Sequence, residues 1–330
     1  MKFLIITNPT SGSKVLKGRP HEKTALALLN AGHEVRVVST EYAGHATEVA
    51  IEACKSDVDV ICAIGGDGTV NEVASALIGS DKVLGIIPNG SGNGLARELN
   101  IPLNTDSAIE TLLNHSVVTI DSCRVNDRPF LCTCGIGFDG SVSEEFSESS
   151  IRGPIVYIKD SVQTFFSHTP ATYHLKIDDK EITTKAFLIA FANASQYGNN
   201  AFIAPNASLT DGIIDVTIIK EFPIVDAAQV AIQLFSKGLD QNPYTELYQG
   251  KEISVTTDTP IPYHVDGEAV GSTDSIQIKM LPASLKVISG DLTASEKTVS
   301  DFFNSITNNI IGLHNDLMSK LGIRHFDQDE

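Results

Sequence analysis

The stretch from Asp59 to Gly79, DVICAIGGDGTVNEVASALIG, joins two different apolar patterns through a run of glycines. Its first part is a short apolar run typical of a buried strand, and its second part has the apolar spacing of a helix. The turn between them holds three glycines and Asp67. Because glycine costs backbone entropy, we expect this turn to need an approach that only glycine allows. One such approach is a ligand in contact with the main chain.

The turn Gly65–Gly68 has the features of an anion site. At the start of a helix its backbone N–H groups, together with the helix dipole, suit a phosphate group. Asp67 cannot bind phosphate itself, since both are anions, so its presence predicts a divalent cation or a hydroxyl nearby. A plain tight turn would account for the glycines but not for Asp67.

Two further glycine-rich turns follow other strand-like runs. PNGSGNGLAREL (Pro88–Leu99) follows the next strand and opens a helix, and NPTSGS (Asn8–Ser13) follows the first strand. Together with the turn Gly65–Gly68, the turn in Pro88–Leu99 predicts two phosphate-facing loops side by side. The turn Asn8–Ser13, which follows the first strand, does not have the glycines of the dinucleotide fingerprint, and this argues against an NAD-dependent dehydrogenase.

Strands and helices alternate over roughly the first 120 residues. This alternation predicts a mostly parallel, doubly wound sheet, in which ligands bind beyond the carboxyl ends of the strands. The expected strands are Phe3–Ile6, Glu34–Thr40, Val58–Ile64 and Val83–Ile87, and the expected helices are His21–Gly32, His45–Ser56 and Asp106–His115.

Strand-like runs dominate from Val117 onward, which predicts a mainly antiparallel β domain of the sandwich type. The expected strands are Val117–Val125, Phe130–Ile136, Thr172–Ile177, Ile182–Ala192, Ile213–Ile219, Ile253–Thr257 and Ser275–Met280, with a hairpin turn in Lys176–Ile182 and helical patches at Pro154–Phe166 and Val225–Phe235.

Composition limits the classes of partner. The formal net charge of −17 argues against nucleic acid and against anchoring to anionic lipid by charge alone. It leaves room for brief hydrophobic contact with a membrane. The five cysteines form no C-x-x-C pair and fit small core residues in a reducing compartment. No apolar run approaches the ~20 residues of a membrane-spanning helix, so we expect a cytoplasmic protein.

The tail from Glu296 onward has a heptad-like apolar stripe. Its members are Val299, Phe303, Ile306, Ile310, Leu313 and Leu317. The stripe fits packing onto the protein's own body or a homodimer contact. A helix on a membrane surface is a weaker alternative, because Lys320 and Arg324 supply little basic charge.

Taken together, these motifs resemble the diacylglycerol kinase-like lipid kinase family, which includes bacterial diacylglycerol kinases, sphingosine kinases and ceramide kinases. NPTSGS, GGDGTVNEV and PNGSGNGLAREL look like its nucleotide-side motifs. YGNNAFIAPNASLTDGIIDV (Tyr197–Val216) resembles its magnesium-associated segment, and HVDGEAV (His264–Val270) its catalytic turn. GGDG also occurs in NAD kinases and phosphofructokinases, and the later segments favour lipid kinases.

The resemblance covers about residues 1–290 and implies two domains with the active site between them. An α/β ATP-binding domain would span residues 1–122, with about 290–330 returning to it, and a β-sandwich lipid-substrate domain would span 123–289. The stretch Gly90–Gly94 lacks the aspartate of the G-T-x-N-D pattern common in bacterial diacylglycerol kinases. In this respect it looks more like the sphingosine and ceramide kinases, which leaves the lipid open.

The resemblance also implies roles for individual residues. ATP would be held by Asn8, Thr40, Gly65, Gly66, Asp67, Gly68, Thr69, Val70, Asn71 and Ser91. Mg²⁺ would be bound by Asp211 with the main-chain carbonyls of Ser208 and Ile213, since Mg²⁺ prefers oxygen ligands. Glu268 would be the general base, with Asp67 as the rival base. His264 in the same turn is interpreted as structural.

The implied function is an ATP- and Mg²⁺-dependent lipid kinase. Its leading substrate is diacylglycerol, which would become phosphatidic acid, and a sphingoid base or ceramide is the second candidate. The lipid would be taken from a membrane surface or a carrier, so we expect transient membrane contact. The alternatives are an NAD kinase and a catalytically silent lipid-binding protein. The presence of both Asp67 and Glu268 argues against the silent protein.

Overall fold

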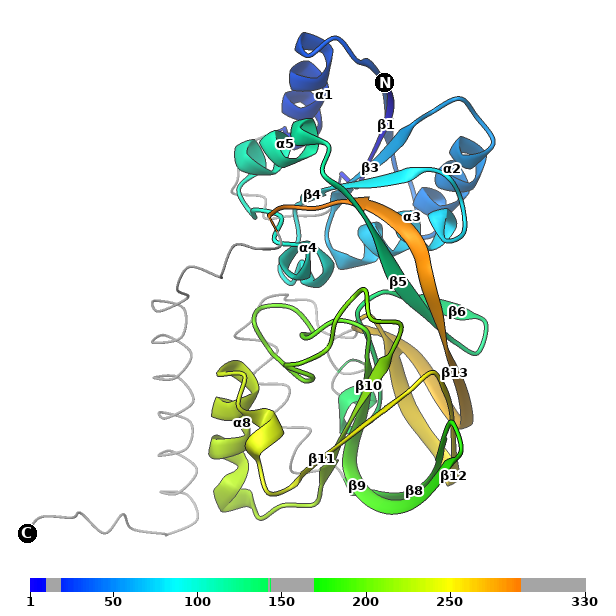
Figure 1. The fold of residues 1–330 in the computed structure, drawn as a ribbon, viewed down its shortest axis with the longest axis vertical. Helices are drawn as coiled ribbons and strands as arrows, with labels where there is room; N and C mark the ends of the chain where they lie inside the picture. The colour runs from blue at the N-terminus through cyan, green and yellow to red at the C-terminus, as the bar shows by residue number, and fades with distance from the viewer. Residues whose placement is uncertain (10–18, 142, 144–168, 292–330) are drawn as a thin grey trace, which may run out of the picture.

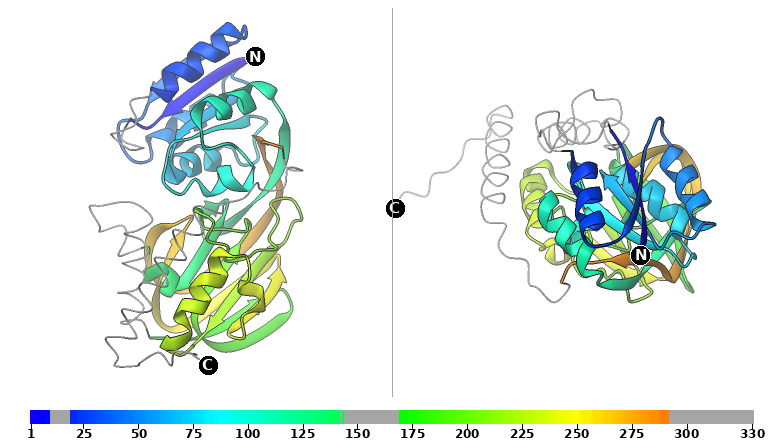
Figure 2. Two further views of the ribbon diagram at one scale, coloured as in Figure 1. Left: turned by 90° about the vertical axis from the view of Figure 1, so that its left-hand side faces the viewer. Right: turned by 90° about the horizontal axis from the view of Figure 1, so that it is seen from above.

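The computed structural model describes residues 1–9, 19–141, 143 and 169–291. They form two parts stacked along the long axis of the molecule, an α/β part at the N-terminus and a strand-rich part below it (Figure 1). A turn of the view about the vertical axis shows the same stacking (Figure 2). The predicted fold class is therefore confirmed.

Four parallel strands form the sheet of the first part, in the order β4-β3-β1-β2. The helices α1 and α5 contact each other on one side of these strands, and α2 and α3 contact each other on the other side (Figure 1). Because helices cover both faces, β3 is buried at every residue and reads as a continuous apolar run. The elements are β1 (Lys2–Thr7), α1 (Pro20–Asn30), β2 (Glu34–Ser39), α2 (His45–Cys54), β3 (Val60–Gly65), α3 (Asp67–Leu77), β4 (Val83–Pro88), α4 (Gly94–Glu98) and α5 (Thr105–Asn114).

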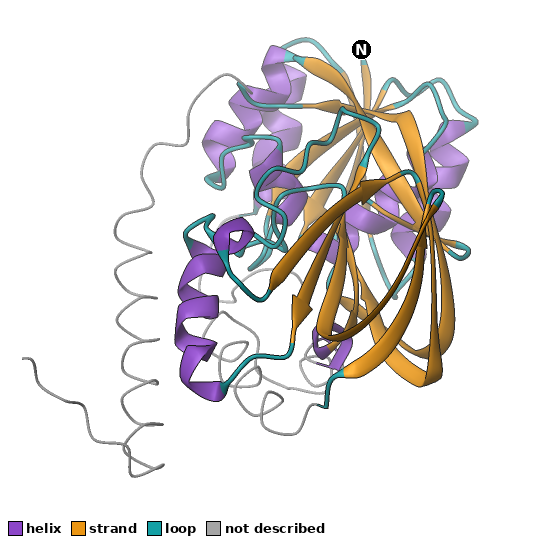
Figure 3. Ribbon diagram, turned by 60° about the horizontal axis from the view of Figure 1, so that its bottom comes forward, coloured by secondary structure: helices purple, strands orange, loops and turns teal. Residues whose placement is uncertain are grey.

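Antiparallel strands build the second part (Figure 3). The long strands β9 and β12 each pair with β8 at one end and with β7 at the other, so these four strands close around an apolar core. The elements are β5 (Val117–Val125), β6 (Arg128–Phe130), β7 (Thr133–Gly137), β8 (Ala171–Ile177), β9 (Lys180–Ala192), β10 (Ile214–Lys220), η1 (Ile224–Asp226), α8 (Ala227–Phe235), η2 (Leu239–Gln241), β11 (Thr245–Gly250), β12 (Glu252–Val265) and β13 (Glu268–Ile288).

The strand β13 belongs to both parts. It begins in the second part, and near its end Lys286 and Val287 pair in parallel with β4 of the first part. Along the way it pairs with β5, with an irregularity between Leu281 and Leu285. Asp121 on β5 fills this irregularity and accepts hydrogen bonds from the N–H groups of Ala283 (2.6 Å) and Gly212 (2.7 Å). The two parts thus share one continuous sheet.

The second part departs in detail from the strand predictions. The single strand expected at Phe130–Ile136 is divided into β6 and β7, because the N–H groups of Leu131 and Cys132 turn toward a side chain instead of a neighbouring strand. The strands β12 and β13 are longer than expected, and β11 was not predicted. Pro260 concealed the length of β12, since proline is unusual in a strand, but here it falls in an irregular stretch of the pairing.

Two helical predictions have different outcomes. The patch at Val225–Phe235 corresponds to η1 and α8. The patch at Pro154–Phe166 and the apolar stripe from Val299 to Leu317 lie outside the described residues. Within the described part of the chain, no helix has both the length and the apolar character needed to cross a membrane.

Candidate active site

The predicted nucleotide-side residues meet at one edge of the parallel sheet. Thr7 pairs with both Ser39 and Ile64, so Asn8, Thr40 and Gly65 continue from neighbouring strands at the same end. The N–H of Asn8 donates to the Ile64 carbonyl at 3.2 Å, and that of Thr40 to the Thr7 carbonyl at 2.9 Å. The strand order changes direction between β1 and β3, which is where an open α/β sheet forms its ligand crevice.

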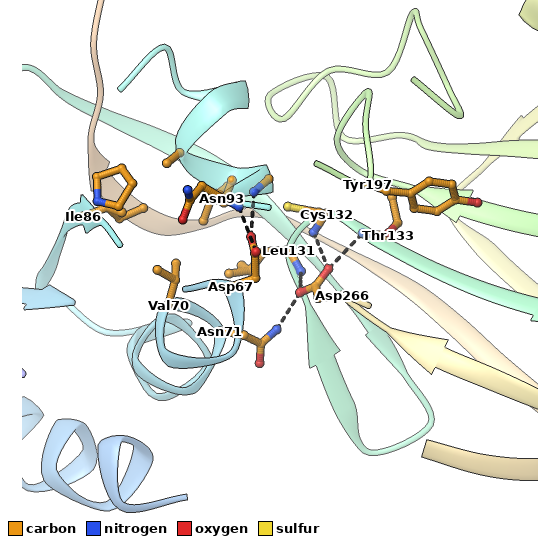
Figure 4. Close-up of a pocket in the computed structure, with 14 residues that line it drawn as sticks. Asp67, Val70, Asn71, Ile86, Asn93, Leu131, Cys132, Thr133, Tyr197 and Asp266 are labelled. Atoms are coloured by element: carbon orange, nitrogen blue, oxygen red, sulfur yellow. Dashed lines mark hydrogen bonds between the residues drawn. The ribbon is translucent and has the colours of Figure 1, made fainter. Parts of the chain in front are cut away.

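Asp67 joins the first glycine loop to the second. Its Oδ1 accepts a hydrogen bond from the Gly94 N–H at 2.6 Å, and its Oδ2 accepts one from the Asn93 N–H at 2.8 Å (Figure 4). These two donors lie at the start of α4, where N–H groups have no partner within the helix. A plain turn did not explain why Asp67 is present. The structure shows that its carboxylate anchors the second glycine loop.

The structure gives a different reason for the glycines than the expected contact between a ligand and the main chain. A Cβ atom on Gly90 would lie 2.4 Å from Gly66 Cα, and one on Gly92 would lie 2.6 Å from Asp67 Oδ2. A Cβ on Gly65 would lie 2.6 Å from the Thr69 side chain. At these positions glycine is required because the protein chain approaches itself, whether or not a ligand also contacts the main chain.

Asn71 and Glu72, further along the same helix, hold two other segments. The side-chain amide of Asn71 donates to Asp266 Oδ2 at 2.5 Å, across the junction between the two parts (Figure 4). The carboxylate of Glu72 accepts hydrogen bonds from the N–H groups of Gly44 (3.0 Å) and Ala46 (3.1 Å) at the start of α2. Glu72 thereby steadies the loop that begins at Thr40.

Asp266 is a site residue that the sequence reasoning missed. Besides the bond from Asn71, its carboxylate accepts hydrogen bonds from three successive N–H groups, those of Leu131 (2.9 Å), Cys132 (2.8 Å) and Thr133 (2.9 Å). Burial raises the pKa of the Asp266 carboxyl above its ordinary value, although these hydrogen bonds act in the opposite direction. Asp266 could have been identified from the sequence, because it directly precedes Gly267 and Glu268 in the predicted catalytic turn.

The turn between β12 and β13 carries Glu268 to the first glycine loop. Asp266 (φ 47°) and Gly267 (φ 82°) form a two-residue turn with positive φ at both positions, for which Asp-Gly is a favoured sequence. Val265 pairs with Glu268 across the turn. A Cβ on Gly68 would lie 2.6 Å from Glu268 Oε1, so the carboxylate rests against the first turn of α3. The structure thus brings the two predicted catalytic residues to the same loop.

This contact makes Gly68 a sensitive position. If Glu268 is the general base that the resemblance implies, Gly68→Ala should lower kcat by about 10-fold or more, since a displacement of ~1 Å at a reacting group costs roughly 100-fold. Stability should not fall, because alanine is the better helix residue and the crowded atom ends a flexible side chain.

Steady-state kinetics and thermal unfolding would measure both effects. The matched control is Gly238→Ala, where the nearest atom to a new Cβ is 3.5 Å away, an ordinary contact. Equal kcat in wild type and Gly68→Ala would show that Glu268 does not need its observed position.

The second glycine loop also contacts the second part of the protein. Ser195 Oγ donates to Glu98 Oε2 at 2.7 Å, and Arg97 Nη1 donates to Asn200 Oδ1 at 3.4 Å. Burial raises the pKa of the Glu98 carboxyl, against the effect of its hydrogen bonds. The start of the predicted magnesium-associated segment, Tyr197–Val216, therefore contacts the second glycine loop and the helix that follows it.

A pocket lies where α3, the second glycine loop and the β6–β7 connection meet (Figure 4). Of the predicted site residues, Asp67, Val70 and Asn71 line this pocket. Glu268 and the other predicted ATP contacts do not, namely Asn8, Thr40, Gly65, Gly66, Gly68, Thr69 and Ser91. The full lining is Asp67, Val70, Asn71, Ile86, Pro88, Asn93, Gly94, Leu95, Ala96, Leu131, Cys132, Thr133, Tyr197 and Asp266. The pocket thus borders the loops on the side of the domain junction.

The predicted magnesium ligands lie in a separate turn. Asp211 Oδ1 accepts a hydrogen bond from the Ile213 N–H at 3.0 Å, and Gly212 is held by Asp121 at the crossing of β5 and β13. Nearby, Asp215 Oδ2 is buried and has no hydrogen-bond partner. Burial, and then the charge of Asp211, raises the pKa of the Asp215 carboxyl.

These features fit a hard cation. A bound Mg²⁺ would give the unpaired oxygen of Asp215 a partner and would reduce the repulsion between Asp211 and Asp215. Among the described residues, no three metal-ligating side chains cluster together, so main-chain carbonyls such as those of Ser208 and Ile213 would have to complete the site.

Two family models match the chain. The diacylglycerol kinase catalytic domain matches residues 2–125. The YegS C-terminal NAD kinase beta sandwich-like domain matches residues 132–289.

Curated relatives match at about 30% identity. An uncharacterized protein of Synechocystis sp. is 34% identical over 236 residues, which are 69% of this chain and 54% of that protein, so the chain spans about half of its length. A Staphylococcus aureus protein named "Putative lipid kinase" is 30% identical over 73% of this chain and 80% of its own. A diacylglycerol kinase of Staphylococcus saprophyticus is 29% identical over 81% of this chain and 88% of its own.

Solved structures share the fold. A crystal structure titled as a putative diacylglycerol kinase from Bacillus anthracis superimposes with a TM-score of 0.73 at 24% sequence identity. The match covers 89% of this chain and 98% of that one, and it includes both the α/β part and the strand-rich part.

Proposed function

Because this chain belongs to the diacylglycerol kinase-like family of lipid kinases, we propose that it transfers the γ-phosphoryl group of ATP to the hydroxyl of diacylglycerol, giving phosphatidic acid. The observation that carries the proposal is the position of Glu268 Oε1 against Gly68, which puts a carboxylate beside a phosphate-type glycine loop. The carboxylate can accept the proton of an alcohol, and the glycine loop can bind the phosphates of a nucleotide. Together they match the two substrates of a kinase.

ATP would lie at the carboxyl ends of β1 to β4. Asn8 follows β1 and Thr40 follows β2 at this end of the sheet. Those main-chain N–H groups of Gly65–Asn71 that are not bonded within α3, together with Ser91, would face the phosphates. Phosphoryl transfer depends on positioning and charge stabilisation more than on covalent chemistry. The bonds from Asp67 and Glu72 to neighbouring loops would supply that positioning.

Glu268 would act as the general base. An alcohol is a weak nucleophile, and a positioned carboxylate that accepts its proton typically contributes ~10²–10⁴-fold. Asp67 is the less suitable base, because a hydroxyl would have to compete with the two N–H groups that its oxygens already bind. Its remaining lone pairs can accept hydrogen bonds from water molecules of a bound Mg²⁺.

Asp211, with the carbonyls of Ser208 and Ile213, would hold Mg²⁺ in the second part of the protein. Asp215 would add negative charge beside it, in keeping with its unpaired buried oxygen. The ion at Asp211 would be structural, whereas the Mg²⁺ near Asp67 would supply the neutralisation of phosphate charge that a kinase needs.

A Mg²⁺ titration tests the Asp211 site. The wild-type protein should gain thermal stability as Mg²⁺ rises, because a ligand that binds only the folded state stabilises it. Asp211→Ala should lose most of this gain and part of its activity. Asp179→Ala, in the exposed β8–β9 turn, is the matched control. Equal Mg²⁺-induced melting shifts in Asp211→Ala and wild type would rule the site out.

A sphingoid base or ceramide is the second candidate substrate. The observation that favours it is the lack of an aspartate in Gly90–Gly94. Here Asn93 closes the loop on itself, since its side chain accepts from the Gly90 N–H at 2.9 Å and donates to the Gly90 carbonyl at 2.8 Å.

One experiment separates the candidates. The protein is incubated with γ-labelled ATP, Mg²⁺ and a panel of dispersed diacylglycerol, ceramide and sphingoid base, with NAD in a parallel reaction. Labelled phosphatidic acid is the expected product. Labelled ceramide or sphingoid phosphate would change the substrate, and labelled NADP alone would indicate an NAD kinase. Lipid binding without any transfer would indicate a silent lipid-binding protein.

A further inference from the structure

A buried pair of polar side chains lies behind the turn that carries Glu268. His264 is 1% exposed and Asp139 is 4% exposed. His264 Nε2 and Asp139 Oδ2 are 2.9 Å apart, although the ring N–H is not aligned for a hydrogen bond, so their contact is one of charge and dipole. Asp139 Oδ2 also accepts a hydrogen bond from the Tyr197 hydroxyl at 2.6 Å.

The other nitrogen of His264 contacts the turn itself. The N–H of Gly267 donates to His264 Nδ1 at 3.2 Å. This bond requires a lone pair on Nδ1, so the imidazole must carry its proton on Nε2. Asp139 is the negative charge beside Nε2, and it favours that tautomer.

The surrounding chain leaves the pair little freedom. A Cβ on Gly135 would lie 2.0 Å from Asp139 Oδ2 and 2.5 Å from His264 Nε2, so β7 can pass over the pair only with glycine at this position. The Tyr197 ring also packs against His264, with the ring centroids 5.9 Å apart. The imidazole orientation is therefore set by packing as well as by charge.

We propose that His264 and Asp139 are positioning residues for Glu268. Asp139 fixes the tautomer of His264, and His264 holds the Gly267 N–H so that the Asp266–Gly267 turn presents Glu268 to Gly68. The inference rests on the proposed function, in which Glu268 takes the proton of the lipid hydroxyl. It also ties Glu268 to Tyr197, whose carbonyl borders Gly94 in the second glycine loop.

Two substitutions at His264 separate the roles of its nitrogens. The side-chain oxygen of asparagine can replace Nδ1 as the acceptor for Gly267, whereas the amide nitrogen of glutamine replaces Nε2 and leaves Gly267 without its acceptor. We expect His264→Gln to lower kcat by about 10–100-fold, the range set by a displacement of ~1 Å or less at a reacting group. His264→Asn should retain more of kcat than His264→Gln, and KM for MgATP should stay within about twofold in both.

Tyr197→Phe provides a milder test that keeps the packing. It removes only the hydroxyl that donates to Asp139, so kcat should fall by a few-fold in the same direction. The matched control is His174→Gln, at an exposed histidine on β8 whose Nδ1 contacts Thr183. Thermal unfolding and MgATP binding identify a variant that fails to fold.

A double-mutant cycle decides the inference. If His264 acts through Glu268, then His264→Gln should cause little further loss of kcat in a Glu268→Gln background, because coupled residues are not additive. Additive losses, or a normal kcat in His264→Gln and Tyr197→Phe, would overturn the positioning role and leave the proposed function standing. A normal kcat in Glu268→Gln alone would overturn the assigned base, and the positioning role with it.

Discussion

Replacement of Glu268 by glutamine is expected to lower kcat by about 10²–10⁴-fold, the contribution typical of a positioned general base. Glutamine keeps the shape of the side chain and removes its ability to accept the proton. The affinity for MgATP should change little, because Glu268 belongs to the β12–β13 turn and not to the sheet edge. Stability should also be unchanged, since the side chain is exposed.

Initial rates at saturating lipid, with direct measurement of MgATP binding, would check this expectation. Glu181→Gln, an exposed glutamate on β9, is the matched control and should behave as wild type. A Glu268→Gln protein with nearly normal kcat would move the role of base to Asp67.

Asp67→Asn is expected to abolish turnover for a different reason. An asparagine side chain has one oxygen instead of two, so its NH₂ group would face the N–H of either Asn93 or Gly94. A donor left without an acceptor in this way costs about 1–3 kcal/mol. The second glycine loop would lose its anchor, and any water-mediated contact with Mg²⁺ would weaken. Unlike Glu268→Gln, this variant should lose stability together with activity.

Chemical denaturation and a Mg²⁺ titration of the rate would measure the two effects. Asp106→Asn is the matched control, because Asp106 also lies in the first turn of a helix but is exposed. Wild-type activity in Asp67→Asn at every Mg²⁺ concentration would refute the catalytic role of Asp67. Unchanged stability would refute its role as an anchor.

The fold could be predicted where burial produces a simple apolar pattern in the sequence. The strand β3 is buried along its whole length, so it appears as an unbroken apolar run that ends at the glycines. In the second part, long strands such as β13 alternate between exposed and buried residues and contain irregular pairing. Only the tertiary pairing shows that such a segment is one strand.

The sequence suggested candidate site residues, but it could not indicate the contacts that hold them in place. Asp67 and Glu268 were both chosen from the sequence, yet the bonds that place them come from distant segments. Asp266 is separated by 135 residues from Leu131, whose N–H it binds, and by 195 residues from Asn71. Glycine spacing indicated a close approach without indicating what approaches. The neighbours turned out to include Thr69, Gly90 and Asp67 itself.

The strand β13 has a mechanical consequence for the junction between the two parts. Among the described residues, the chain passes between the two parts through β5 and returns through β13, and these strands are hydrogen-bonded to each other across the crossing (Figure 1). Many two-domain enzymes swing on loosely tethered hinges. In this paired ribbon the register is interrupted between Leu281 and Leu285, where Asp121 accepts its two hydrogen bonds. We expect any relative movement of the two parts to twist this ribbon, and because Glu268 begins β13, such a twist would turn its carboxylate relative to the glycine loops.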